Sequence, residues 1–186
     1  MNLSEYFSQY FETISKGIKS IESAQLKKVA KMVWVVHKSG KKIILVGNGG
    51  SAAMASHVAV DFTKAAGIRA INFNEADLIT CLANDYGYER WVEKALEAYS
   101  DPGDLVILIS SSGKSPNMLN GAKQAKAMGL SLVTVSGFSK ENPMRKLGDL
   151  NLWVDSTAYN IVEMTHHVWL LSIIDYLIHQ KEEKAS

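Results

Sequence analysis

Short apolar runs that alternate with helix-length segments are the feature that most constrains this chain of 186 residues. Strands are predicted at five of these runs, at residues 41–47, 69–73, 104–109, 132–135 and 150–154. Helices are predicted between and after them, at residues 51–66, 76–83, 88–99, 115–128, 143–147 and 161–178. Strands that alternate with helices form a parallel sheet covered on both faces. The sequence therefore predicts an α/β protein, a three-layer αβα sandwich that binds ligands beyond the carboxyl ends of its strands.

Two further helices, at residues 3–20 and 23–37, precede the first strand. The first has aromatic and aliphatic side chains at helical spacing: Tyr6, Phe7, Tyr10, Phe11, Ile14 and Ile18. Because this face of the first helix is so apolar, we expect it to pack on another subunit or along the domain. We therefore predict one domain over residues 1–186, with residues 1–40 as a helical appendage for oligomer packing and residues 41–180 as the core.

Composition excludes several classes of partner. The formal net charge is +1, with 20 basic and 19 acidic residues, so no electrostatic footprint for nucleic acid or an anionic membrane is present. Cys81 is the single cysteine, which excludes disulfides within the chain and cysteine-rich zinc sites and fits a reducing compartment. We expect a cytoplasmic protein with neither nucleic-acid nor membrane partners.

The first strand is followed by a glycine-rich loop, VGNGGSAAMASH, at residues 46–57. Its glycines allow a tight turn and close approach of the backbone to a ligand, and Ser51 is predicted to cap the helix that follows. Gly47 to Ala52 also matches the dinucleotide pattern G-x-G-x-x-A. That site needs an acidic residue at the end of the second strand, where this chain has Asn72, and Glu75 comes too late in the chain to fill the position. An anion site at the helix end and a plain strand-to-helix turn both remain open.

A second polar loop, LISSSGKSPN, follows the apolar run that ends at Ile109. Its GKS triplet suggests a P-loop, but Leu108 occupies the position where that motif requires glycine. Serine hydroxyls and helix-end amides can bind one phosphate without a metal. Two such loops at strand ends of one sheet therefore indicate a phosphate ligand and argue against a nucleotide cofactor.

Four segments together carry a resemblance to a known family. GNGGSA, CLANDYGYE, PGDLVILISSSGKSPN and DST…VEMTHH occur in the order and spacing of the phosphoheptose isomerases, which belong to the sugar-isomerase (SIS) domain family. The resemblance covers nearly the whole chain. It implies a flavodoxin-like five-stranded parallel sheet, a homotetramer with active sites at subunit interfaces, and conversion of sedoheptulose 7-phosphate to the aldoheptose 7-phosphate.

The resemblance also implies which residues contact the substrate. The serine loop would hold the phosphate, and the first loop and the NDYG aspartate would face the sugar. The expected substrate-binding residues are Asn48, Gly49, Ser51, Glu75, Asp85, Ser110, Ser111, Ser112, Ser115 and Glu163.

Ketose–aldose isomerisation needs a base that moves a proton between C1 and C2, and an acid or a metal that polarises the oxygens. The family places His and Glu four residues apart on the helix after the first loop, and this chain has His57 and Asp61. On its last helix the family has Gln and, eight residues later, His; the matching positions here are Glu163 and Leu171.

His167 lies on the same helical face as Glu163 and is the expected substitute for the missing histidine. We therefore predict Asp61 as the base and His167 as the acid. The family can hold zinc at these positions, and the expected ligands here are His57, Asp61, Glu163 and His167.

Three alternatives stay open at this point. A non-catalytic SIS protein that binds sugar phosphates is favoured by the departures at Glu163 and Leu171, whereas His57 and the acid at position 61 favour an enzyme. An isomerase for another sugar phosphate would use Lys114 as an added charge. A nucleotide-cofactor enzyme ranks last.

Overall fold

The computed structural model describes residues 2–185 and contains one five-stranded parallel sheet. The strand order is β2-β1-β3-β4-β5, with β1 at Ile43–Gly47, β2 at Ala70–Asn72, β3 at Leu105–Ser110, β4 at Ser131–Ser136 and β5 at Leu150–Trp153. Every neighbouring pair of strands is parallel. The predicted fold class is confirmed.

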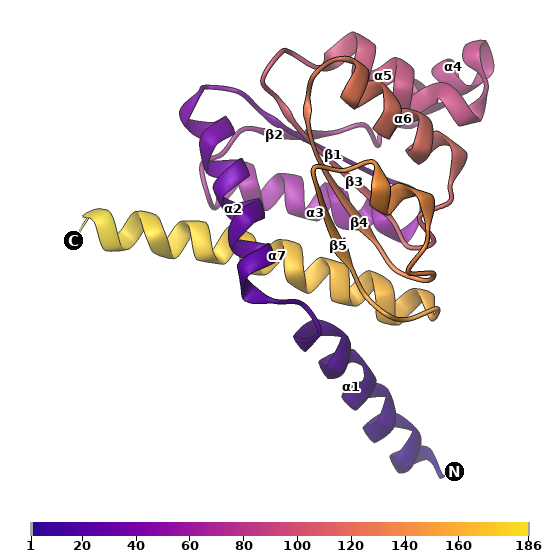
Figure 1. Ribbon diagram of the computed structural model, residues 1–186, viewed down its shortest axis with the longest axis vertical. Coiled ribbons are helices and arrows are strands. Elements are labelled where there is room, and N and C mark those ends of the chain that lie inside the picture. The colour runs from indigo at the N-terminus through magenta and orange to yellow at the C-terminus, as the bar shows by residue number, and fades with distance from the viewer. Residues whose placement is uncertain (1, 186) are drawn as a thin grey trace.

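Helices cover the sheet on both faces (Figure 1). On one face pack α2 (Ser23–Lys38), α3 (Gly50–Lys64) and α7 (Tyr159–Ala185); on the other pack α5 (Trp91–Tyr99) and α6 (Pro116–Ala127), with α4 (Ala76–Tyr86) alongside. Side chains of β3 alternate between the two cores, so Ile107 joins the first and Leu108 the second. Because both faces are covered, the central strands are apolar throughout, which is why they stand out in the sequence.

Element boundaries differ from the prediction where local geometry intervenes. The helix expected at residues 88–99 begins as a 3-10 turn, η1 (Tyr88–Arg90), because Gly87 adopts φ 88° and ends α4 there. The last helix runs past residue 178 to Ala185, and His179 and Glu183 form an i, i+4 pair in this extension. A further 3-10 helix, η2, spans Pro143–Lys146.

Helix α1 (Leu3–Lys19) projects from the body of the protein (Figure 1). Its carboxyl end is anchored on α7, where Trp169 Nε1 donates a hydrogen bond to the Ile18 carbonyl (2.9 Å). Gly17 lies so close to Thr165 that a Cβ there would come within 2.6 Å of the threonine hydroxyl. The amino-terminal part has no such contact, and Leu3, Tyr6, Phe7 and Phe11 are exposed.

Within the described residues, α7 is the one helix long and apolar enough to cross a membrane by length and composition. Half of its apolar stretch is buried inside the protein, where Trp169 and Leu170 join the core. That burial is typical of a central helix of a folded domain.

Candidate active site

The two predicted loops meet at one edge of the sheet. Strands β1 and β3 are hydrogen-bonded neighbours with Gly47 opposite Ile109, so the loops that follow them lie side by side. They enclose a cavity of 280 Å³. Its lining consists of Asn48, Gly49, Gly50, Ser51, Ile109, Ser110, Ser111, Ser112, Ser115, Tyr159 and Glu163. Eight of the ten expected substrate-binding residues are therefore brought together.

The glycine-rich loop after β1 leads into α3, whose N-cap lies two residues earlier than predicted. Gly49, at φ 54°, is the N-cap of α3, and the prediction that Ser51 caps this helix was wrong. Ser51 is instead buried in the first turn, and a Cβ on Gly47 would come within 2.5 Å of its backbone. Glycine at position 47 is thus required for the chain to fold back so closely, and Ser51 lines the cavity.

The serine loop holds several hydroxyls that are not committed to the fold. Ser115 is the N-cap of α6, yet its side chain makes no capping hydrogen bond. Its hydroxyl lies 3.4 Å from that of Ser110, and the buried Ser111 hydroxyl makes no well-formed hydrogen bond and has the Glu163 carboxyl group as its neighbour. Buried hydroxyls are rarely left unpaired, so this loop is suited to a polar ligand.

Gly113 fixes the shape of the serine loop. It has φ 63°, and a Cβ there would overlap the side-chain amide of Asn142, which is fully buried. Asn142 in turn donates to the carbonyls of Gly137 (3.1 Å) and Ser139 (2.8 Å). The loop is therefore seated on a rigid base, while Lys114 is exposed at its tip.

Glu163 reaches the cavity from α7 and lies against Gly50 so closely that a Cβ on that glycine would overlap the carboxylate. Burial raises the pKa of Glu163, and the neighbouring Ser111 hydroxyl opposes this only in part. The cavity thus has a partly desolvated carboxyl group on one wall and hydroxyl groups on another.

His57, Asp61 and His167 form a hydrogen-bonded chain beside the cavity. Asp61 Oδ2 lies 3.2 Å from His57 Nε2, and His57 Nδ1 lies 3.0 Å from His167 Nε2. Burial lowers the pKa of His167 and the neighbouring His57 lowers it further, while Asp61 acts in the opposite direction. The three side chains do not line the cavity itself, but His167 follows Glu163 by one helical turn.

The predicted zinc ligands do not converge as one set. His57, Asp61 and His167 are linked pairwise, whereas Glu163 points to Gly50 and the first loop. Within residues 2–185, no three His, Cys, Asp or Glu side chains gather closely enough to hold a metal ion. The four side chains are therefore not gathered around one point in this structure, and zinc binding stays a prediction.

Glu75 and Asp85 are the two expected substrate contacts that the structure does not bring to the cavity. Glu75 is exposed at the start of α4, and Asp85 is exposed near the end of that helix, where it accepts a hydrogen bond from Asn84 (2.9 Å). Leu171, at the position of the family's histidine, packs against the core. His166 is likewise a core residue, and burial lowers its pKa to about 4.

Sequence reasoning missed Asn117 and Tyr88. Asn117 is buried at the start of α6 and exchanges two side-chain hydrogen bonds with Asn48, of 3.0 and 2.9 Å. The Tyr88 hydroxyl also donates to Asn48 Oδ1 (3.3 Å). The available signal was an asparagine directly after the serine loop, in SPN, and a tyrosine in the segment CLANDYGYE.

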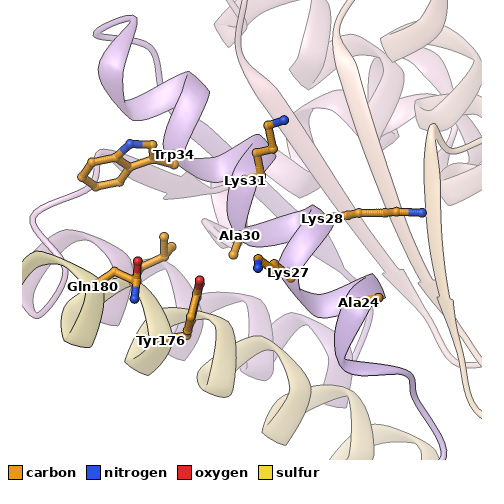
Figure 2. A pocket seen from close by; sticks show the side chains of 9 residues that line it. Ala24, Lys27, Lys28, Ala30, Lys31, Trp34, Tyr176 and Gln180 are labelled. Atoms are coloured by element: carbon orange, nitrogen blue, oxygen red, sulfur yellow. The ribbon is translucent and has the colours of Figure 1, made fainter. Parts of the chain in front are cut away.

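A larger groove of 470 Å³ lies between α2 and α7, away from the strand ends (Figure 2). Trp34 and Ala30 of α2 face Tyr176 and Gln180 of α7 across it, while Lys28 and Lys31 point away from α7. It holds no carboxylate, histidine or hydroxyl cluster of the kind found at the serine loop. The groove is therefore a candidate packing surface and not the candidate active site.

Comparison with known proteins agrees with this geometry. A model of the SIS domain matches residues 5–137. The phosphoheptose isomerase of Fusobacterium nucleatum subsp. nucleatum is 35% identical over 182 residues, which cover 94% of this chain and 93% of that protein. The enzyme of the same name from Aliarcobacter butzleri is 36% identical over 166 residues, which cover 86% of this chain and 87% of the other.

Among solved structures, phosphoheptose isomerase from Neisseria gonorrhoeae superposes with a TM-score of 0.86 at 23% identity, covering 95% of this chain and 99% of that one. The structural match shows the same fold. Together with the sequence matches, it places the chain in the SIS domain family, among the phosphoheptose isomerases.

Proposed function

We propose that the protein is an aldose–ketose isomerase that acts on sedoheptulose 7-phosphate or a similar phosphosugar. The observation that carries the proposal is the single cavity between two glycine–serine loops, with uncommitted hydroxyls on one side and a carboxyl group on the other. Relatives that match along almost their whole length are named phosphoheptose isomerase.

The phosphate binds at the serine loop in this proposal. Ser110, Ser112 and Ser115 donate hydroxyl hydrogen bonds, and the buried Ser111 hydroxyl adds a fourth. The amino-terminal end of α6 favours an anion there. The sugar hydroxyls then lie along Asn48, Gly49, Ser51 and Glu163, on the opposite wall of the cavity.

The proton transfers are assigned to the hydrogen-bonded chain beside the cavity. Asp61 removes the proton from C1 of the ketose and returns it at C2, through an enediol, while His167 moves the proton between the two oxygens. His57 follows Ser51 by six residues of α3, about 9 Å along the helix axis. A phosphosugar anchored at the serine loop extends its reacting carbons in that direction, which holds them near these groups.

Incubation with sedoheptulose 7-phosphate, followed by detection of the aldose, tests this function. Binding without turnover would favour the alternative of a non-catalytic sugar-phosphate-binding protein. The observation in favour of that alternative is Leu171, which packs against the core at the position of the family's histidine.

Replacing both Ser112 and Ser115 by alanine is expected to abolish the rise in melting temperature that sedoheptulose 7-phosphate produces in the native protein. The variant loses two of the hydroxyls that hold the phosphate. Thermal unfolding with and without the sugar phosphate measures this. Ser131→Ala is the matched control, because Ser131 begins β4 at the opposite edge of the sheet. An unchanged shift in the double variant would contradict the assignment of the phosphate site.

Self-association into a homotetramer, with active sites at subunit interfaces, is a further part of the proposal. It is supported by α1, which projects with Leu3, Tyr6, Phe7 and Phe11 exposed on one helical face, and by the apolar groove between α2 and α7 (Figure 2). Surfaces of this kind mark interaction sites.

Replacing Phe7 and Phe11 by serine is expected to dissociate the oligomer, since burial of each phenyl ring in an interface stabilises it by about 1.5–3 kcal/mol. Sedimentation velocity measures the change in mass. Gln9→Ser, on the opposite face of α1, serves as the control and should leave the mass unchanged. An oligomer that survives the double substitution would show that α1 is not part of the interface.

Zinc remains a separate proposal that rests on the family resemblance, and metal analysis of the purified protein tests it directly. A zinc content near zero would remove it. Location in the cytoplasm is proposed because Cys81 is unpaired and exposed, which suits a reducing compartment.

A further inference from the structure

Asn48 and Asn117 connect the two loops of the candidate site through a reciprocal pair of amides. Asn48 Nδ2 donates to Asn117 Oδ1 (3.0 Å), and Asn117 Nδ2 donates to Asn48 Oδ1 (2.9 Å). The two residues are 69 positions apart, one directly after β1 and the other in the first turn of α6. Asn117 is only 1% exposed.

The pair determines how Asn48 faces the cavity. In these two hydrogen bonds each side-chain amide donates one N–H and accepts at its oxygen once. Asn48 therefore keeps a second N–H for a ligand. Asn48 lines the cavity, whereas Asn117 lies behind it and does not. The Tyr88 hydroxyl donates to the same Asn48 oxygen (3.3 Å), so both lone pairs of that oxygen are occupied and the amide cannot turn over without losing partners.

The pair also fixes the separation of the loops. The Asn48 carbonyl accepts a hydrogen bond from Ser51 N (3.0 Å), so the side chain and the turn of the first loop are held together. Asn117 follows Ser115 by two residues and is therefore rigidly attached to the serine loop. A ligand that spans both loops needs them at a constant distance, and an entirely apolar contact would not set the orientation of Asn48.

We propose that Asn117 is a positioning residue of the sugar-phosphate site, which holds the Asn48 amide toward the ligand and locks the first loop to the serine loop. The inference rests on the proposed function, because it assumes that a phosphosugar bridges these two loops. Asn117 itself does not touch the ligand.

A double-mutant cycle on ligand affinity tests this. The dissociation constant of sedoheptulose 7-phosphate is measured by calorimetry for the native protein, Asn117→Ala, Asn48→Ala and the double variant. We expect Asn117→Ala to weaken binding about tenfold, as for loss of one well-made hydrogen bond to the ligand. In the Asn48→Ala background the same substitution should have almost no effect. Additive losses would overturn the proposal.

Controls separate this result from a loss of folding or of the proposed function. Asn120→Ala, one turn further along α6, removes a hydrogen bond to the Glu89 carbonyl and should leave the affinity unchanged. Asn117→Ser keeps a polar side chain that is too short to reach Asn48, and it replaces the alanine variant if that one fails to fold. If neither Asn117 variant folds, the amide serves the core and the proposal is wrong. Failure of the native protein to bind the phosphosugar would instead overturn the proposed function.

Discussion

Asp61→Ala is expected to slow the isomerisation of sedoheptulose 7-phosphate by about 10²- to 10⁴-fold, the usual contribution of a positioned general base. The substitution removes the carboxylate that takes the C1 proton. It also removes the partner of His57 Nε2, 3.2 Å away, so His57 no longer has a fixed orientation toward His167. Initial rates of aldose formation at several substrate concentrations measure kcat and KM.

Two replacements at the same position separate these roles. Asp61→Asn keeps an oxygen that can accept from His57 but cannot take a proton, so it should be almost as inactive as Asp61→Ala. Asp61→Glu keeps the base and adds the methylene that the resembling enzymes have, so it should retain activity. Activity of the asparagine variant close to native would show that Asp61 only positions His57.

The variants should remain folded, because the Asp61 side chain is 34% exposed and its carboxylate pairs with His57, which is itself exposed. Asp175→Ala, at an exposed position two turns beyond His167 on α7, is the matched control and should have native activity. Equal background rates in the native protein and Asp61→Ala would remove the isomerase proposal. The proposal for phosphosugar binding at the serine loop would be unaffected.

The parallel sheet was predictable because its strands are buried on both faces. Runs such as Leu105–Ser110 are apolar at every position but the last, so they stand out from the amphipathic helices around them. The edge strand was harder to delimit: β2 has three residues, Ala70–Asn72, and all of them are only partly buried. Pairing on one side alone gives such a strand little sequence signature.

The two loops of the site were predictable for a related reason. Parallel strands end at the same edge of the sheet, so polar loops after β1 and β3 have to meet if the strands are neighbours. The contact of Asn117 with Asn48 could not be found in this way, because it depends on the distance and register between residues 69 positions apart. Glu75 and Asp85 lie away from the cavity for the complementary reason: the packing of α4 decides where they lie, and no local pattern reports it. Their role as substrate contacts stays a prediction.

The hydrogen-bonded chain of Asp61, His57 and His167 forms without a histidine at position 171. Leu171 is partly buried and packs against the core, so a histidine there would replace an apolar contact. His167 instead meets His57 from the preceding turn of α7, at 3.0 Å. The i, i+4 spacing from Glu163 to His167 could be recognised in the sequence. The contact of His167 with His57 on α3 could not.

Asp104→Ala is expected to reduce the free energy of unfolding by about 3 kcal/mol, because it breaks a buried ion pair from one side. Asp104 is fully buried and its carboxylate has three partners: Lys42 Nζ (2.6 Å), Lys42 N (3.0 Å) and Asp101 N (2.8 Å). These contacts join the amino-terminal ends of β1 and β3. The substitution leaves two backbone N–H groups without an acceptor and Lys42 with Asp101 as its remaining carboxylate.

Urea unfolding of the native protein, Asp104→Ala and Asp104→Asn measures this effect. Asparagine keeps the shape and one acceptor oxygen, so it should lose less stability than alanine. Burial by itself lowers the pKa of Lys42, but the hydrogen bonds and charges of Asp101 and Asp104 outweigh it and raise the pKa overall. Because the pKa of Lys42 is raised by folding, the contribution of its charge to stability is complete below 10.5, the pKa in the unfolded chain. This contribution is lost only at higher pH.

The stability difference between native protein and Asp104→Ala should therefore be constant from neutral pH to about pH 9. The binding of phosphosugar by the folded variant should be unchanged, because Asp104 lies at the edge of the sheet opposite the serine loop. A loss below about 1 kcal/mol would mean that the pair contributes no more than an exposed one. In that case the backbone pairing of β1 with β3, and not this carboxylate, sets the register that brings the two loops together.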